Sequence, residues 1–209
     1  MALRVYPLGG PTPVRGVDAI REIPSLLAAS GAKKPMLVTG PKLYERGLAD
    51  GVLDALRGSF ADFTVFSGVS SEPTEQMAAD IAALFTQNAC DSMIAFGGGS
   101  PIDAAKAALA LAARPDKPAF RLRGLLKVRR RLPPLIAVPT TAGTGSETTF
   151  AAVLTGGSGK YAITDPCLFP MYAVLDARLT LSLTPSVTAD TGMDALTHAV
   201  EAYLCVLTN

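Results

Sequence analysis

The sequence predicts an α/β fold in which a parallel, Rossmann-like sheet is flanked by helices. Short apolar runs alternate with helical patterns at intervals of roughly thirty residues, the spacing of a strand, a crossover helix and the next parallel strand. Two of these runs lead directly into loops suited to ligand binding, at residues 97–100 and 139–147. Because ligands bind at the carboxyl ends of parallel strands, we expect both loops at one sheet edge.

The individual elements follow from apolar periodicity and from the positions of glycine and proline. The pattern of Ile20, Ile23 and Leu27 predicts a first helix, which ends at Gly31 as its C-terminal cap. Strands are predicted at residues 4–6, 36–39, 63–66, 93–96, 135–138 and 173–175, with a hairpin formed by 150–154 and 161–164. Further helices are predicted at residues 44–57, 73–88, 101–113 and 192–204.

The stretch at residues 92–113 has the pattern of a strand, a glycine turn and a helix. Gly97, Gly98 and Gly99 lack a Cβ, so a ligand can approach the main chain of this turn closely. Ser100 is expected to cap the helix, with Pro101 at its first position. The N–H groups and the dipole of such a helix attract anions, so the turn predicts phosphate binding. A turn that needs glycine only for packing is the alternative.

The helix after this turn is rich in alanine, the strongest helix former. Its buried face is predicted to consist of Ile102, Ala105, Leu109 and Ala112. Asp103 would repel phosphates if it faced them. We therefore expect its carboxylate to turn back to the Ser100 N–H or to pair with Lys106.

The loop at residues 139–147 offers two glycines and the hydroxyl groups of Thr140, Thr141, Thr144 and Ser146. Hydroxyls and bare backbone are suited to phosphate oxygens or to the polar edge of a cofactor ring. A polar turn with only local Ser/Thr hydrogen bonds is the alternative. Two such loops at the same sheet edge favour a cofactor site.

Composition limits the class of protein and its partners. Of the 209 residues, 49% are apolar and only 18% are charged, which is compatible with a surface partly covered in a homo-oligomer. The net charge of +1 argues neither for a nucleic-acid partner nor for an acidic one, and no apolar run approaches membrane-spanning length. The three cysteines, Cys90, Cys167 and Cys205, lie far apart without a Cys-x-x-Cys pair, so we expect reduced thiols in a cytoplasmic protein.

Six of the twelve residues at 120–131 are basic. A nucleic-acid surface would explain such a tract, but no aromatic residues are interleaved for base stacking. We interpret the tract as a solvated connector before the next strand.

The predicted helix at residues 192–204 separates two kinds of side chain. Asp194 and His198 are four residues apart and therefore lie one above the other on a helix surface. A carboxylate and an imidazole so placed can bind one divalent metal ion, or they can simply pair with each other. An apolar stripe lies on another side of the helix and comprises Met193, Leu196, Val200 and Leu204.

Three motifs together resemble one family. These are Gly-Gly-Gly-Ser-Pro-Ile-Asp-Ala-Ala-Lys at 97–106, the loop at 139–148, and Gly-Met-Asp-Ala-Leu-Thr-His-Ala-Val-Glu-Ala-Tyr at 192–203. They closely resemble the iron-containing (group III) alcohol dehydrogenases. The resemblance implies a dinucleotide-binding domain related to that of dehydroquinate synthase at residues 1–184. Residues 185–209 would then be the first segment of an all-helical, metal-binding domain.

The same resemblance implies roles for particular residues. Gly97, Gly98, Gly99 and Ser100 would hold the pyrophosphate of NAD(P), and Gly40 would lie at the cofactor ribose. Thr140, Thr141 and Ser146 would contact the nicotinamide end. Asp194 and His198 would be the first two ligands of a divalent iron or zinc ion. The implied reaction is hydride transfer between nicotinamide and a small alcohol or aldehyde.

Two departures from the family pattern matter. NAD-dependent members often hold an Asp where this sequence has Gly40, so a preference for NADP is expected. Two further histidine ligands of the family lie beyond Asn209, so the metal site is half built and this chain alone is expected to be inactive. A maleylacetate reductase-like sister enzyme and a non-catalytic nucleotide-binding module are the alternatives.

Overall fold

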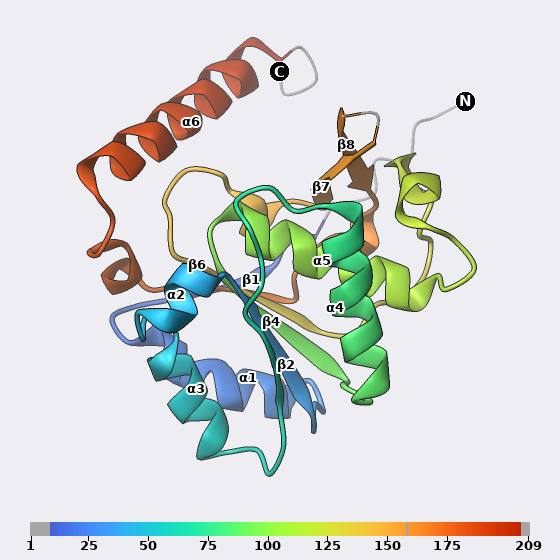
Figure 1. Cartoon of the computed structure of the whole chain (residues 1–209). Helices are drawn as coiled ribbons and strands as arrows, with labels where there is room; N and C mark the ends of the chain where they lie inside the picture. Colours follow the sequence, from blue (N-terminus) through green and yellow to red (C-terminus); the bar gives the residue numbers. More distant parts are fainter. Residues whose placement is uncertain (1–8, 158, 206–209) are drawn as a thin grey trace.

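The computed structural model describes residues 9–157 and 159–205 and confirms the predicted α/β class (Figure 1). Six parallel strands form one sheet in the order β1-β9-β6-β4-β2-β3. Their bounds are β1 Thr12–Arg15, β2 Pro35–Thr39, β3 Thr64–Phe66, β4 Ser92–Gly97, β6 Leu135–Pro139 and β9 Tyr172–Leu175. A small second sheet has the order β5-β8-β7, with bounds β5 Gly124–Leu125, β7 Ala151–Gly156 and β8 Gly159–Thr164.

Helices cover both faces of the large sheet, which is why its central strands are mostly apolar. On one face α4 and α5 pack against Met36, Met93 and Leu135, and on the other α1 and α3 pack against alternate residues of the same strands. The helices are α1 Ile23–Ala29, α2 Pro41–Glu45, α3 Asp50–Arg57, α4 Glu75–Gln87, α5 Gly99–Ala113 and α6 Pro185–Leu204. Short 3₁₀ turns are η1 Ala19–Glu22, η2 Ala119–Leu122, η3 Ser146–Thr148, η4 Pro166–Leu168 and η5 Ala177–Thr180.

Most strand predictions are confirmed, and two short strands were not predicted. The strands expected at 36–39, 63–66, 93–96, 135–138 and 173–175 all form, and β7 and β8 make the expected antiparallel hairpin. The strand expected at residues 4–6 lies outside the described residues. The unpredicted β1 pairs with β9 at the sheet edge, where its mostly exposed side chains leave no apolar pattern to detect.

Two helix predictions were wrong in detail. The helix expected at 44–57 is broken into α2 and α3, because Gly47 adopts a φ of 70° that turns the chain between them. The first helix is likewise divided, since 3₁₀ turn η1 precedes α1. Pro24 lies in the first turn of α1, where its missing N–H costs no hydrogen bond.

Helix α5 is enclosed on all sides, whereas the sequence predicted a single buried face. Every residue from Pro101 to Ala110 is buried, between the large sheet and α4 on one side and the small sheet on another. Alanines allow this close approach because they add almost no side-chain volume. Ala112, expected on the buried face, is only half-buried.

The basic tract at 120–131 is more structured than a solvated connector. Its six basic side chains are exposed as expected, but Leu122 and Val128 are buried and the tract contains β5, which pairs with β8. The buried Asp165 carboxylate holds the C-terminal part of this tract in place by accepting hydrogen bonds from the N–H groups of Val128 (3.2 Å) and Arg129 (2.9 Å).

Helix α6 lies apart from the sheet (Figure 1). It begins at Pro185, capped by the Thr184 hydroxyl, and none of its residues is buried. Its apolar stripe is exposed, with Met193 at 61% and Leu204 at 70% of full accessibility. The assignment of residues 185–209 to a second domain stays a prediction. None of the helices in the described ranges combines the length and apolarity needed to cross a bilayer.

Replacing Asp165 with Asn is expected to lower the free energy of unfolding by about 2 kcal/mol at neutral pH, because the amide places a donor against backbone N–H groups. Burial alone raises the pKa of Asp165, but hydrogen bonds from Arg129, Cys167 and Val128 outweigh it and lower the pKa below its usual value. The carboxylate therefore stabilises the fold above the unfolded pKa, and this contribution is lost as the pH falls through the folded value.

Urea unfolding of both proteins from pH 7 downward tests this prediction. The difference between them should narrow below about pH 4. Asp54→Asn is the control, because that exposed carboxylate pairs with the exposed Arg57 at the surface and should change stability little. A difference that stays constant to acid pH would show that the Asp165 charge is not responsible.

Candidate functional site

The two predicted loops begin side by side at the carboxyl edge of the large sheet. Gly97 ends β4 opposite Pro139 of β6, and the Thr140 N–H donates to the Gly97 carbonyl oxygen at 2.9 Å. Gly97 has a φ of 148°, and a Cβ there would lie 2.6 Å from the Pro101 ring. Only glycine therefore allows β4 to turn into α5 at this point.

Ser100 is not the cap of α5, which corrects the sequence prediction. The helix begins at Gly99 with Gly98 as its N-cap, and no side chain caps it. Ser100 lies within the first turn, so its hydroxyl points out of the helix and donates to the Ser71 carbonyl oxygen at 2.6 Å. The N-terminus of a fifteen-residue helix is thus open toward a ligand.

The second loop lies directly against the first. A Cβ at Gly98 would be 3.2 Å from the Thr141 hydroxyl, and a Cβ at Gly99 would be 3.2 Å from the Ser146 hydroxyl. Thr141 Oγ1 is buried without a hydrogen-bond partner. Both loops therefore present hydroxyls and bare backbone to the same space.

Three adjoining hollows run along this edge. The Leu181 hollow, about 310 Å³, is lined by Leu43, Phe96, Thr140, Leu179 and Leu181. The Gly40 hollow, about 440 Å³, shares Leu43 and is lined by Gly40, Lys42, Val69, Gly98, Gly99 and Ser100. The His198 hollow, about 530 Å³, shares Gly99 and Ser100 and is lined by Thr144, Ser146, Thr149, Lys160, Asp194 and His198. The glycine turn thus lies in the middle of one extended track.

The metal-ligand candidates of α6 line the last of these hollows. His198 Nε2 lies 3.7 Å from Asp194 Oδ1, and the two side chains are 53% and 44% exposed. The helix passes so close to the second loop that a Cβ at Gly143 would collide with the Thr191 carbonyl. The described residues contain no group of three or more His, Cys, Asp or Glu side chains placed to hold a metal.

Asp103 and Lys106 do not behave as helix-surface residues. Asp103 Oδ2 accepts a hydrogen bond from the Val153 N–H at 3.1 Å, not from Ser100, while Oδ1 is buried without a partner. The Lys106 ammonium binds main-chain oxygens of the second loop, the nearest being Ser146 O at 2.6 Å. Burial raises the pKa of Asp103, and burial lowers the pKa of Lys106 to about 8, partly opposed by Asp103 and Glu147.

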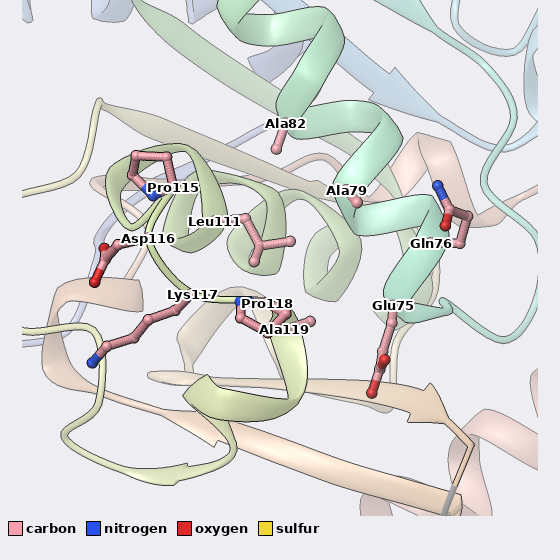
Figure 2. A pocket seen from close by; sticks show the side chains of 10 residues that line it. All are labelled: Glu75, Gln76, Ala79, Ala82, Leu111, Pro115, Asp116, Lys117, Pro118 and Ala119. Atoms are coloured by element: carbon pink, nitrogen blue, oxygen red, sulfur yellow. The ribbon is translucent and has the colours of Figure 1, made fainter.

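A further hollow lies between α4 and the turn at residues 115–119 (Figure 2). Its volume is about 470 Å³, and half of its ten lining residues are alanine or proline, with Glu75, Asp116 and Lys117 among the polar residues. No residue predicted for the site lines it. It is therefore not part of the candidate site.

The family assignment rests on the sequence match. The family model for iron-containing alcohol dehydrogenases matches residues 11–177. This chain belongs to the iron-containing alcohol dehydrogenase family. The NAD-dependent methanol dehydrogenase of Bacillus methanolicus is 35% identical over 196 residues, which are 93% of this chain and 51% of that protein. The chain spans about half the length of the curated relatives it matches.

Solved structures of iron-containing alcohol dehydrogenases show the same fold. A crystal structure of 1,3-propanediol oxidoreductase matches with a TM-score of 0.93 at 34% identity, covering 99% of this chain and 55% of that chain. Sulfoacetaldehyde reductase from Bifidobacterium kashiwanohense, solved in complex with NAD⁺, matches with a TM-score of 0.83 at 34% identity, covering 95% and 53%.

Sequence reasoning missed several residues that line the site. Ser71 follows β3, and the rule that ligands bind at strand carboxyl ends would have indicated this loop. Lys160 comes from β8, a hairpin strand outside the parallel sheet, so strand order gives no signal for it. Thr149 directly follows the quoted second motif.

Gly99→Ala is expected to weaken dinucleotide binding by more than about tenfold, because the new Cβ meets Thr144 at 3.1 Å and Ser146 at 3.2 Å and forces the loops apart. Stability should change little, since alanine is a good helix former. Calorimetric titration and thermal unfolding measure the two effects. Gly157→Ala, where a Cβ meets nothing within 4 Å, is the control. Unchanged affinity in Gly99→Ala would place the ligand away from this turn.

Proposed function

We propose that this chain forms the cofactor site and half of the metal site of a metal-dependent NAD(P) alcohol dehydrogenase or aldehyde reductase. The reaction is hydride transfer between nicotinamide and a small alcohol or aldehyde. The observation that carries the proposal is the continuous track, with an open helix N-terminus at its centre and Asp194 and His198 at one end. The names of the relatives, which include an NAD-dependent methanol dehydrogenase, support it.

The track suits an extended ligand with phosphates in its middle. The pyrophosphate would lie over Gly98, Gly99 and Ser100, where the α5 dipole and the uncapped N–H groups favour an anion. The adenosine end would then extend past Gly40 toward Thr140, which lines the Leu181 hollow. This differs from the sequence expectation, which assigned Thr140 and Thr141 to the nicotinamide end. Thr141 lines none of the three hollows.

The nicotinamide end would occupy the His198 hollow, beside Ser146. Asp103 also lines this hollow. Its buried Oδ1 accepts no hydrogen bond of good geometry, although the nearby Ser146 hydroxyl helps to offset the rise that burial causes in the pKa of this carboxyl. A buried acceptor without a donor is costly, so this oxygen fits an amide N–H such as that of the nicotinamide carboxamide. The ring would then lie at the same end of the track as the metal-ligand pair.

The donor set of Asp194 and His198 fits a divalent iron or zinc ion in part. Carboxylate and imidazole are suitable ligands, but a catalytic site commonly uses three or more protein ligands and here two are present. A bound metal would supply Lewis-acid stabilisation of the alcohol oxygen. Asp194 and His198 would supply two ligands to such an ion beside the nicotinamide end. A non-catalytic nucleotide-binding module is the alternative that a two-ligand site favours.

The cofactor preference is proposed to be NADP(H). Gly40 carries no carboxylate to accept the ribose 2′-OH or to repel a 2′-phosphate, and the exposed Lys42 lines the same hollow. Titration with NAD⁺ and NADP⁺ should show tighter binding of NADP⁺. Absence of binding of either at about 1 mM would contradict the proposed function.

Gly40→Asp should shift the ratio of affinities toward NAD⁺ by about tenfold. A Cβ at residue 40 meets the Val69 carbonyl at 3.0 Å, so Gly40→Ala is the control for crowding. Crowding lowers both affinities, whereas charge changes their ratio. Equal ratios in the two variants would exclude the electrostatic explanation.

This chain alone is expected to retain less than about 0.1 metal ion after dialysis and to show no alcohol-dependent NAD(P)H formation, because two protein ligands are too few. Metal analysis and an assay with added Fe²⁺ or Zn²⁺ and a short primary alcohol measure this. His198→Ala is the matched variant. Stoichiometric metal, or turnover that His198→Ala abolishes, would mean that further ligands come from elsewhere, most directly from another chain.

A further inference from the structure

We propose that Lys106 is a positioning residue, whose buried ammonium group fixes residues 146–151 against α5 and so holds the loop beside the nicotinamide end in place. The inference rests on the proposed function, because the loop matters only if a dinucleotide occupies the track. Lys106 itself does not line any of the three hollows.

The contacts of Lys106 are those of a fully enclosed cation. Its side chain has no solvent-accessible surface. Nζ lies 2.6 Å from Ser146 O, 2.8 Å from Thr149 O and 3.0 Å from Ala151 O, and 2.9 Å from the Thr149 hydroxyl. An ammonium has three donors and no acceptor, which suits a site made only of oxygens. One side chain of α5 thus binds three main-chain positions of the loop.

A charged group is costly to bury, so its presence in this position requires compensation. Burial lowers the pKa of Lys106 to about 8, and the charges of Asp103 and Glu147 oppose that shift. The ammonium therefore remains mainly protonated at neutral pH and keeps all of its N–H donors. Asp103, one turn earlier on α5, binds the Val153 N–H at 3.1 Å and anchors the start of β7 in the same way.

The anchored segment carries two side chains of the His198 hollow. Ser146 and Thr149 both line that hollow, and Ser146 faces Gly99 across the junction of the two loops. Loss of the ammonium would leave buried carbonyl oxygens without a donor, and the segment would move to satisfy them. The nicotinamide end of the track would then change shape, while the Gly40 hollow, which this segment does not line, would remain.

The test compares two ligands in Lys106→Met, which keeps an unbranched apolar stem. The dissociation constant of the preferred dinucleotide should rise by about tenfold or more, whereas that of ADP, which lacks the nicotinamide half, should change by less than about twofold. Hydrogen exchange at residues 146–151 should increase in parallel. Leu109→Ala, a buried change one turn further along α5, is the control for lost stability and should leave the ratio of the two affinities unchanged.

Equal changes for both ligands in Lys106→Met, or unchanged dinucleotide affinity, would overturn the proposal and leave Lys106 a purely structural residue. If Lys106→Met does not fold, the two ligands are compared in Lys106→Gln. The glutamine amide retains two N–H donors, so the dissociation constant of the dinucleotide should rise by a smaller factor in that variant. If the unmodified chain binds neither ligand, the proposed function is wrong. Unchanged hydrogen exchange at residues 146–151 in the Lys106 variant would, independently, overturn the anchoring role of Lys106.

Discussion

The enclosure of α5 is the constraint on which the rest of the structure depends. The helix is packed between the large sheet, α4 and the small sheet, so it cannot shift or rotate without disturbing all three. Such close packing requires small side chains, which explains its many alanines. It also fixes the helix N-terminus at the carboxyl edge of the sheet, directly after Gly97 (Figure 1). The position of the open helix N-terminus, where we propose that the pyrophosphate binds, is therefore a consequence of core packing.

The parts of the fold that were predictable are those with a strong local signal. Central parallel strands are buried on both faces, so they appear as continuous apolar runs, as in Met36–Val38 and Leu135–Val138 in this sequence. Strands β1 and β5 were missed because their exposed residues form only edge contacts. The break at Gly47 was missed because periodicity continues across it. An alanine-rich helix has little periodicity of any kind, so full burial of α5 was not apparent.

In the candidate site, too, the features with a local sequence signal were predicted and those that depend on tertiary contacts were not. The glycine turns and the strand ends correctly predicted that the two loops lie close together. The hydrogen-bond partners of individual side chains depend on burial, however, and the spacing of residues in the sequence does not reveal burial. Asp103 and Lys106 look like a helix-surface pair because they are three residues apart, yet both are enclosed and each binds the main chain of another element. Ser100 looks like a cap because it precedes Pro101, yet the helix begins at Gly99, two residues before Pro101, and Gly98 is its N-cap. In each case tertiary contact overrides a rule that holds for isolated helices.

Helix α6 approaches the second loop through a backbone contact. Its Asp194 and His198 face the hollow that Ser146 lines, while Met193 and Leu204 remain exposed on the helix. No buried side chain holds α6 in position. What brings it close is Gly143, whose missing Cβ leaves room for the Thr191 carbonyl. Gly143 lies in the same loop as Ser146, whose carbonyl oxygen the Lys106 ammonium binds. On the proposed function, the distance between Asp194 and His198 and the nicotinamide end therefore depends on the conformation of this loop.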